Sequence, residues 1–210
     1  PILLDREVVA KEIGERWGEK FYVKHDGSLS HGFEVVSHPA TLAYHMASEG
    51  MGWTSLLKRL QKLGAQSHNT STCGLHVHAS KMAFGARSGQ ADGEDKLLIL
   101  FKRHWDYIVQ LTRREKEQLD KWATPNHQMT SDDRFIHSLQ DLKSQNGTRY
   151  VAVNCLNPNT VEFRLWKGTL SLPTILGTLQ FCKLVVECAS KWTRQECWES
   201  TWEGIVEAAK

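Results

Sequence analysis

The segment Cys73-Gly74-Leu75-His76-Val77-His78-Ala79-Ser80 places two histidines two residues apart within an apolar run. Side chains of a β-strand alternate between its two faces, so His76 and His78 point the same way and their apolar neighbours point the opposite way. Two imidazoles on one face can bind a metal ion or an anionic phosphate while the apolar face is buried. A solvated polar face stays open as the other explanation, because a His-x-His match alone is only a hypothesis.

A second alternating segment, TVEFRLWKGT over residues 160–169, combines a carboxylate with a guanidinium. The alternation predicts that Glu162, Arg164 and Trp166 share one strand face. The acidic and basic side chains can form a structural ion pair, or they can face a metal ion and a phosphate. Arginine suits the second role because its planar fork binds phosphate or carboxylate through two parallel hydrogen bonds.

A third strand, GFEVVSHP over residues 32–39, contains a single carboxylate, that of Glu34. Burial of an unpaired carboxylate is costly, so Glu34 requires a cation, a hydrogen-bond donor or water. Residues 21–24 are expected to pair with this strand as a hairpin around Asp26-Gly27, a strong turn signal. Pro39 ends the strand because it cannot donate to a ladder.

The remaining pattern predicts helices and a second hairpin. Strand 150–154 is expected to pair with 161–166 across Asn157-Pro158-Asn159. Residues 85–93 are predicted to form a mobile loop, and the charged run 113–117 a solvated helical face. Helices are expected over Asp5–Trp17, in the second half of Thr41–Leu63 with Gly64 as C-cap, over Asp95–Lys121, from Pro173 onward and around Ile205. This order favours an α+β fold, an antiparallel sheet with helices packed on one face.

Length and composition limit the function classes. The 210 residues predict a single domain spanning 1–210 that buries its own core. A net charge of +2 and scattered basic residues predict no nucleic-acid partner, and no apolar run near 20 residues was found, which predicts no membrane partner. Five cysteines, without Cys-x-x-Cys spacing, favour thiols in a reducing compartment and hence a cytoplasmic location. No P-loop or Rossmann glycine motif is present.

Taken in order, DGSLSHGFEVVSHP (26–39), TCGLHVHAS (72–80) and RYVAVNCLNPNTVEFRLWKGTL (149–170) resemble the amidoligase family. These are carboxylate–amine ligases related to glutamine synthetase and glutamate–cysteine ligase. The resemblance runs from about Tyr22 to the helix beyond Pro173, and it implies a glutamine-synthetase-like antiparallel sheet that binds Mg-ATP in a cleft. Family members begin with a Glu-x-Glu strand that this sequence lacks, so the first strand is expected to be missing and the domain to be N-terminally incomplete.

The resemblance also implies a reaction and residue roles. The reaction is ATP-dependent formation of an amide or isopeptide bond through an acyl phosphate, from small-molecule or peptide carboxylates and amines. Carboxylate ligands suit Mg²⁺, and imidazoles also fit Mn²⁺. The implied metal ligands are Glu34, His76, His78 and Glu162, the ATP-binding residues are His76, His78 and Arg164, and the catalytic residues are Arg164 and Arg149.

Two other functions stay open from the residues alone. The histidine pair with Glu162 or Glu34 fits Zn²⁺ or non-haem Fe²⁺ equally well, as in a metal-dependent hydrolase or oxygenase. A chain without the first strand can also be a non-catalytic nucleotide-binding remnant of the ligase fold. The metal present after purification, and ATP binding without turnover, would discriminate between these functions. The sequence indicates neither the substrates nor the oligomeric state.

Overall fold

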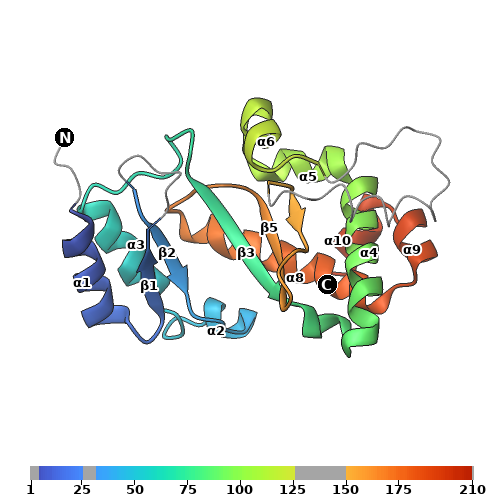
Figure 1. Cartoon of the computed structure of the whole chain (residues 1–210), viewed down its shortest axis with the longest axis horizontal. Coiled ribbons are helices and arrows are strands. Elements are labelled where there is room, and N and C mark those ends of the chain that lie inside the picture. The colour runs from blue at the N-terminus through green and yellow to red at the C-terminus, as the bar shows by residue number, and fades with distance from the viewer. Residues whose placement is uncertain (1–4, 26–31, 126–149, 210) are drawn as a thin grey trace. The chain divides into compact units, whose positions relative to one another are not determined.

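The structure, a computed structural model, describes residues 5–25, 32–125 and 150–209. The chain divides into two compact units: the first comprises Pro1–Cys73 and Gly168–Gly177, and the second Gly74–Lys167 and Thr178–Lys210. Each unit combines helices with one small antiparallel sheet, which confirms the predicted α+β class (Figure 1). The predicted single domain stays a prediction.

The first unit has a two-stranded antiparallel sheet whose register runs from Phe21 opposite Ser37 to Lys24 opposite Glu34. The strands of the predicted hairpin are therefore confirmed, whereas its Asp26-Gly27 turn lies outside the described residues. The elements of this unit are α1 (Arg6–Trp17), β1 (Phe21–Lys24), β2 (Glu34–Ser37), α2 (Leu42–Met46) and α3 (Trp53–Lys62).

Local signals explain where the helices of this unit begin and end. The Asp5 carboxylate accepts hydrogen bonds from the backbone N–H groups of Glu7 at 2.9 Å and Val8 at 3.5 Å, so it caps α1. Gly64 follows α3 with a φ of +84°, as expected for a helix C-terminus. The buried core residues come from α1, β1, α3 and the turn before α3: Val9, Ile13, Phe21, Met51, Leu56 and Leu60.

The second unit contains a three-stranded antiparallel sheet in the order β3-β5-β4, so β5 is the central strand. This confirms the predicted strand around the two histidines and the predicted pairing across residues 157–159, although the first strand of that hairpin spans only Val153–Asn154 and not 150–154. The elements are β3 (Gly74–Ser80), the 3₁₀ helix η1 (Lys81–Phe84), α4 (Arg87–Arg103), α5 (Trp105–Thr112), α6 (Lys116–Trp122), β4 (Val153–Asn154), β5 (Thr160–Lys167), α8 (Leu172–Lys191, which begins in the first unit), α9 (Arg194–Glu199) and α10 (Trp202–Glu207).

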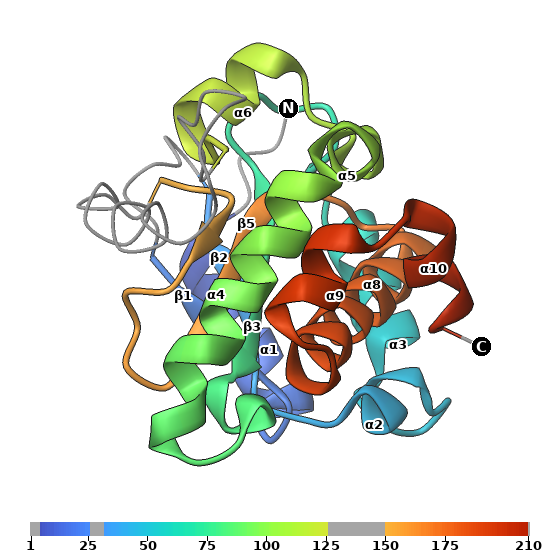
Figure 2. The same cartoon turned by 90° about the vertical axis from the view of Figure 1, so that its right-hand side faces the viewer.

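Helices α4 and α8 pack against one face of this sheet (Figure 2). Between ring centroids, Phe101 of α4 lies 5.7 Å from Phe163 of β5, and Phe181 of α8 lies 5.5 Å from Trp166. The alternation predicted that Trp166 shares the strand face of Glu162, and this prediction is wrong. The register shifts between Leu75, opposite Trp166, and Val77, opposite Phe163, so a β-bulge turns Trp166 into the core.

The segment from 85 to 121 departs most from the prediction. Residues 87–93, predicted as a mobile loop, form the first turns of α4. Gly93 serves close packing there, because a Cβ atom would lie 2.2 Å from Cγ of Phe84. The helix predicted over 95–121 is three helices, interrupted at His104 and at Arg113, whose φ is +59°. The apolar pattern continues across both interruptions and therefore does not reveal them.

Helix α8 is the one helix in the described part of the chain that is long and apolar enough to cross a membrane, a candidate that the sequence analysis overlooked. Length and composition alone give this result, and core helices of soluble proteins pass the same test. Of the apolar window, 39% is buried inside the protein. Cys182, Val185, Cys188 and Ala189 of α8 lie in the core of the second unit. The expected absence of a membrane partner stays a prediction.

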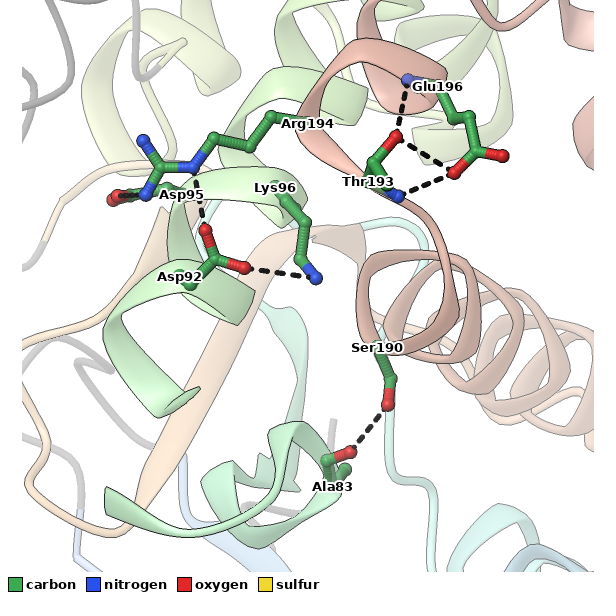
Figure 3. A network of polar contacts seen from close by, with 8 residues as sticks. All are labelled: Ala83, Asp92, Asp95, Lys96, Ser190, Thr193, Arg194 and Glu196. Carbon is green, nitrogen blue, oxygen red and sulfur yellow. Dashed lines mark hydrogen bonds and ion pairs between the residues drawn. The ribbon is translucent and has the colours of Figure 1, made fainter. Parts of the chain in front are cut away.

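Ion pairs of Arg194 connect helix α9 to helix α4 (Figure 3). The Arg194 guanidinium donates from Nε to Asp92 at 2.7 Å and from Nη2 to Asp95 at 2.8 Å. Lys96 forms a further ion pair with Asp92 at 3.1 Å. Thr193 begins α9 with a capping box, in which its side chain and backbone exchange hydrogen bonds with Glu196. The C-terminal helices thus belong to the second unit.

Candidate functional site

Glu162 is the centre of the polar cluster on β3, β4 and β5. The strand register places it directly opposite His78 on β3 and Asn154 on β4. Its Oε1 atom lies 3.4 Å from Nδ1 of His76 and 3.8 Å from Nε2 of His78. Nη1 of Arg164 donates to the same oxygen. The structure therefore brings together four of the predicted site residues around one carboxylate oxygen.

Asn154 holds the other oxygen of Glu162, a contact that the sequence analysis did not predict. Its side-chain N–H donates to Oε2 at 2.9 Å, while its Oδ1 accepts the backbone N–H of Leu156 at 3.0 Å. Both Asn154 and Glu162 are buried. The backbone bond fixes which end of the amide faces Glu162. Asparagine is unfavourable in strands, so an asparagine between two apolar residues could have indicated a side chain with a specific hydrogen-bond partner.

The environment keeps Glu162 ionised and His76 neutral at neutral pH. Burial alone would raise the pKa of Glu162, but the hydrogen bond from Asn154 and the positive charge of Arg164 hold it below its ordinary value. Burial, reinforced by the charge of Arg164 and opposed by that of Glu162, lowers the pKa of His76 to about 4. A neutral imidazole can donate an electron pair to a cation.

The two histidines have different surroundings. The His76 side chain is 27% exposed, and that of His78 is 49% exposed. Nδ1 of His78 forms a hydrogen bond with Oγ1 of Thr160 at 3.2 Å. His76 thus faces Glu162 through Nδ1, and His78 faces it through Nε2.

Arg164 is almost completely buried, with 11% of its side chain exposed. Its Nε atom has no hydrogen-bond partner within the described ranges. The guanidinium carbon lies 5.7 Å from the centroid of the Tyr150 ring. A buried N–H without an acceptor is costly.

A second arginine reaches the cluster from the linker between α5 and α6. Arg114 was predicted on a solvated helical face, but it is buried and its Nε donates to the Trp166 carbonyl at 3.1 Å. Gly74 leaves room for it, because a Cβ atom there would lie 2.4 Å from Nη2 of Arg114 and 3.0 Å from Nε2 of His76. The charge of Arg114 also contributes to the low pKa of His76. Sequence periodicity gave no signal for this long-range contact.

Two further predicted site residues are Glu34 and Arg149, whose part in this cluster stays a prediction. Glu34 lies on β2 of the first unit, opposite Lys24. Arg149 lies outside the described residues. Within residues 5–25, 32–125 and 150–209, no group of three or more His, Cys, Asp or Glu side chains is identified that could hold a metal ion. Metal binding by Glu34, His76, His78 and Glu162 stays a prediction.

Residues 2–186 match the protein-family model described as "Putative amidoligase enzyme". The chain belongs to the amidoligase family. The match includes every residue of the Glu162 cluster and confirms the resemblance found in the sequence. Membership indicates a ligase-type enzyme and does not favour the hydrolase, the oxygenase or the binding remnant for this amidoligase. No curated protein and no solved structure matches the chain.

Proposed function

We propose that this amidoligase uses ATP to join a carboxylate to an amine through an acyl phosphate. The observation that carries the proposal is the convergence of His76, His78 and Arg164 on Glu162, in a chain of the amidoligase family. The substrates are small-molecule or peptide carboxylates and amines. The proposal includes a glutamine-synthetase-like sheet and a cytoplasmic location, where the five cysteines, which form no disulfide in the described part of the chain, stay reduced.

The chemistry explains why such residues are needed. A carboxylate is a poor electrophile, so it is first phosphorylated, and the amine then displaces phosphate. Phosphoryl transfer is catalysed mainly by positioning and by neutralising charge on the phosphoryl oxygens. The Arg164 guanidinium, which faces Glu162 beside the two histidines, is proposed to bind an oxygen of the transferred phosphoryl group. Arg149 is proposed for the same anion or for the substrate carboxylate.

We also propose that these residues bind a divalent cation. Glu162 offers a charged oxygen and His76 a neutral imidazole, and the cluster suits Mn²⁺ as well as Mg²⁺. The residues proposed as ligands within the second unit are Glu162, His76 and His78. A cation bound there would neutralise phosphate charge. Asn154 orients the carboxylate, and the low exposure of Arg164, with 11% of its side chain exposed, limits access of water.

Trapping with hydroxylamine tests the function. The purified chain would be incubated with ATP, Mg²⁺ or Mn²⁺, hydroxylamine and a panel of amino acids and peptides, while ADP and hydroxamate are measured. We expect hydroxamate only where both ATP and one carboxylate are present. Arg164→Lys should lose most of this activity, because an ammonium cannot reproduce the planar fork. Arg16→Lys, an exposed arginine paired with Glu12, is the matched control.

The possible outcomes separate the functions. ADP formed without dependence on a carboxylate would indicate a plain ATPase. Bound ATP and metal without ADP or hydroxamate across the panel would indicate the binding remnant. Near-normal turnover of Arg164→Lys would exclude the role proposed for Arg164.

A further inference from the structure

Thr160 is the hydrogen-bond partner of the more exposed histidine of the cluster. An imidazole with about half of its surface in water has little packing to fix its ring orientation. In the described part of the protein, His78 forms one side-chain hydrogen bond, between its Nδ1 and Oγ1 of Thr160 at 3.2 Å. His76 differs, because it is more deeply buried and lies beside Arg114 over Gly74.

The position of Thr160 is itself fixed. It is the first residue of β5 and lies opposite Ser80, two residues beyond the pairing of His78 with Glu162. Its backbone N–H donates to Oδ1 of Asn157 at 3.2 Å, which ties it to the preceding turn. Threonine is β-branched, so its χ1 angle has few accessible values. The hydroxyl is therefore presented to β3 by a restrained side chain.

The bond selects which nitrogen of His78 faces the cluster. With Nδ1 directed at Thr160, Nε2 lies 3.8 Å from Oε1 of Glu162, too far for a hydrogen bond and open to a ligand. A histidine that binds a cation through one nitrogen commonly donates its other N–H to a neighbouring acceptor. The Thr160 hydroxyl is such an acceptor.

We propose that Thr160 is a positioning residue that directs Nε2 of His78 toward Glu162 and accepts its Nδ1–H when Nε2 binds a divalent cation. This inference rests on the proposed function for its cation. It separates the two histidines: His76 packs beside Arg114 over Gly74, and His78 is oriented by a single hydroxyl. Thr160→Val removes that hydroxyl with almost no change of shape, whereas Thr160→Ser keeps it.

The first experiment needs neither metal nor ATP. Histidine ¹⁵N spectra of the full chain are recorded for the wild type, Thr160→Val and Thr160→Ser, with His78→Gln to identify the His78 signals. We expect the Nδ1 signal of His78 to move in the valine variant and to stay in place in the serine variant. An unmoved Nδ1 signal in Thr160→Val would overturn the proposal.

The second experiment uses Zn²⁺ alone as a diamagnetic probe in a competition titration with a chelating dye. Loss of an outer hydrogen-bond partner typically weakens metal binding about 10- to 100-fold, so Thr160→Val should weaken Zn²⁺ binding about 10-fold and Thr160→Ser by about two-fold at most. Thr54→Val, the same change at an exposed site on α3, should have no effect. Wild-type affinity in Thr160→Val would overturn the proposal. A wild type that binds neither Zn²⁺ nor Mn²⁺ would count against the proposed cation, while the Nδ1 signal would still test the Thr160 contact.

Discussion

At the residue scale, the two oxygens of Glu162 have separate partners, and this division makes a buried carboxylate tolerable. Oε2 accepts the Asn154 amide, and Oε1 faces Arg164 and the histidines. Strand alternation predicts that Glu162 and Arg164 share one face of their strand and that His76 and His78 share one face of theirs. This prediction is possible because alternation depends only on residues close together in the sequence. Asn154 and Arg114 were missed, because their contacts depend on segments brought together by the fold.

Replacement of Asn154 tests this division. Asn154→Ala leaves a buried carboxylate oxygen without its donor, so we expect the free energy of unfolding to fall by about 1–3 kcal/mol. Urea unfolding followed by circular dichroism measures the change. Asn159→Ala, an exposed asparagine of the same hairpin, should change stability by less than about 0.5 kcal/mol. Equal losses in the two variants would contradict the role given to Asn154.

The low pKa of His76 predicts a pH dependence of stability. Unfolded histidine has a pKa near 6.5, whereas His76 in the fold has a pKa of about 4, so between these values the unfolded state binds more protons. The contribution of His76 is therefore complete above about pH 6.5 and is lost as the pH falls toward 4. Unfolding measured from pH 7 to 4 should show a shallower decline in His76→Gln than in the wild type. His68→Gln, at an exposed histidine, is the control. If stability declined equally in His76→Gln and His68→Gln, the role given to His76 would be contradicted.

At the element scale, the strands and most helices follow from periodicity and end signals, as Asp5 and Gly64 show. Two predictions failed at this scale. Glycine at 93 suggested flexibility, but its lack of a side chain serves close packing against Phe84. Apolar periodicity over 95–121 suggested one continuous helix, but the helix is interrupted at His104 and Arg113. A local sequence pattern indicates which residues can form a helix. It does not indicate where a neighbouring side chain requires a glycine, or where the helix is interrupted.

Two glycine substitutions should therefore have opposite effects. Gly93→Ala places a methyl group against the Phe84 ring and should cost about 1–3 kcal/mol of stability. Gly177→Ala, within α8 and with no neighbouring atom within 4 Å of the new Cβ, should add about 0.5–1 kcal/mol. Guanidinium unfolding measures both. A gain in stability for Gly93→Ala would contradict the role of Gly93 in close packing against Phe84.

At the scale of the whole molecule, the family match ends at residue 186, but the second unit continues beyond it. Cys188, Cys197 and Ile205 are buried in its core. Arg194 connects α9 to α4 through two carboxylates. The sequence predicted a short helix near Ile205 but not this connection, because the partners of Arg194 lie about 100 residues away in sequence.

Removal of Arg194 tests the contribution of this connection. The ion pairs are partly exposed, so Arg194→Gln should cost about 1 kcal/mol at low ionic strength. The difference from the wild type should shrink in about 1 M NaCl, because salt screens exposed charges. Lys183→Gln, which removes an ion pair within α8, is the control and should cost less. A loss independent of salt would assign the role of Arg194 to packing and not to charge.

The division of each unit into two stretches of sequence has a practical consequence for dissecting the protein. Residues 168–177 belong to the first unit, where Leu170 packs against its core and its carbonyl accepts the Gln61 side chain at 3.4 Å. A gene truncated after Cys73 would therefore encode a first unit with an uncovered apolar surface. A fragment from Gly74 to the end would carry ten residues without their partners. Neither unit can be obtained intact by shortening the chain from one end, and an engineered first unit would need residues 74–167 replaced by a linker.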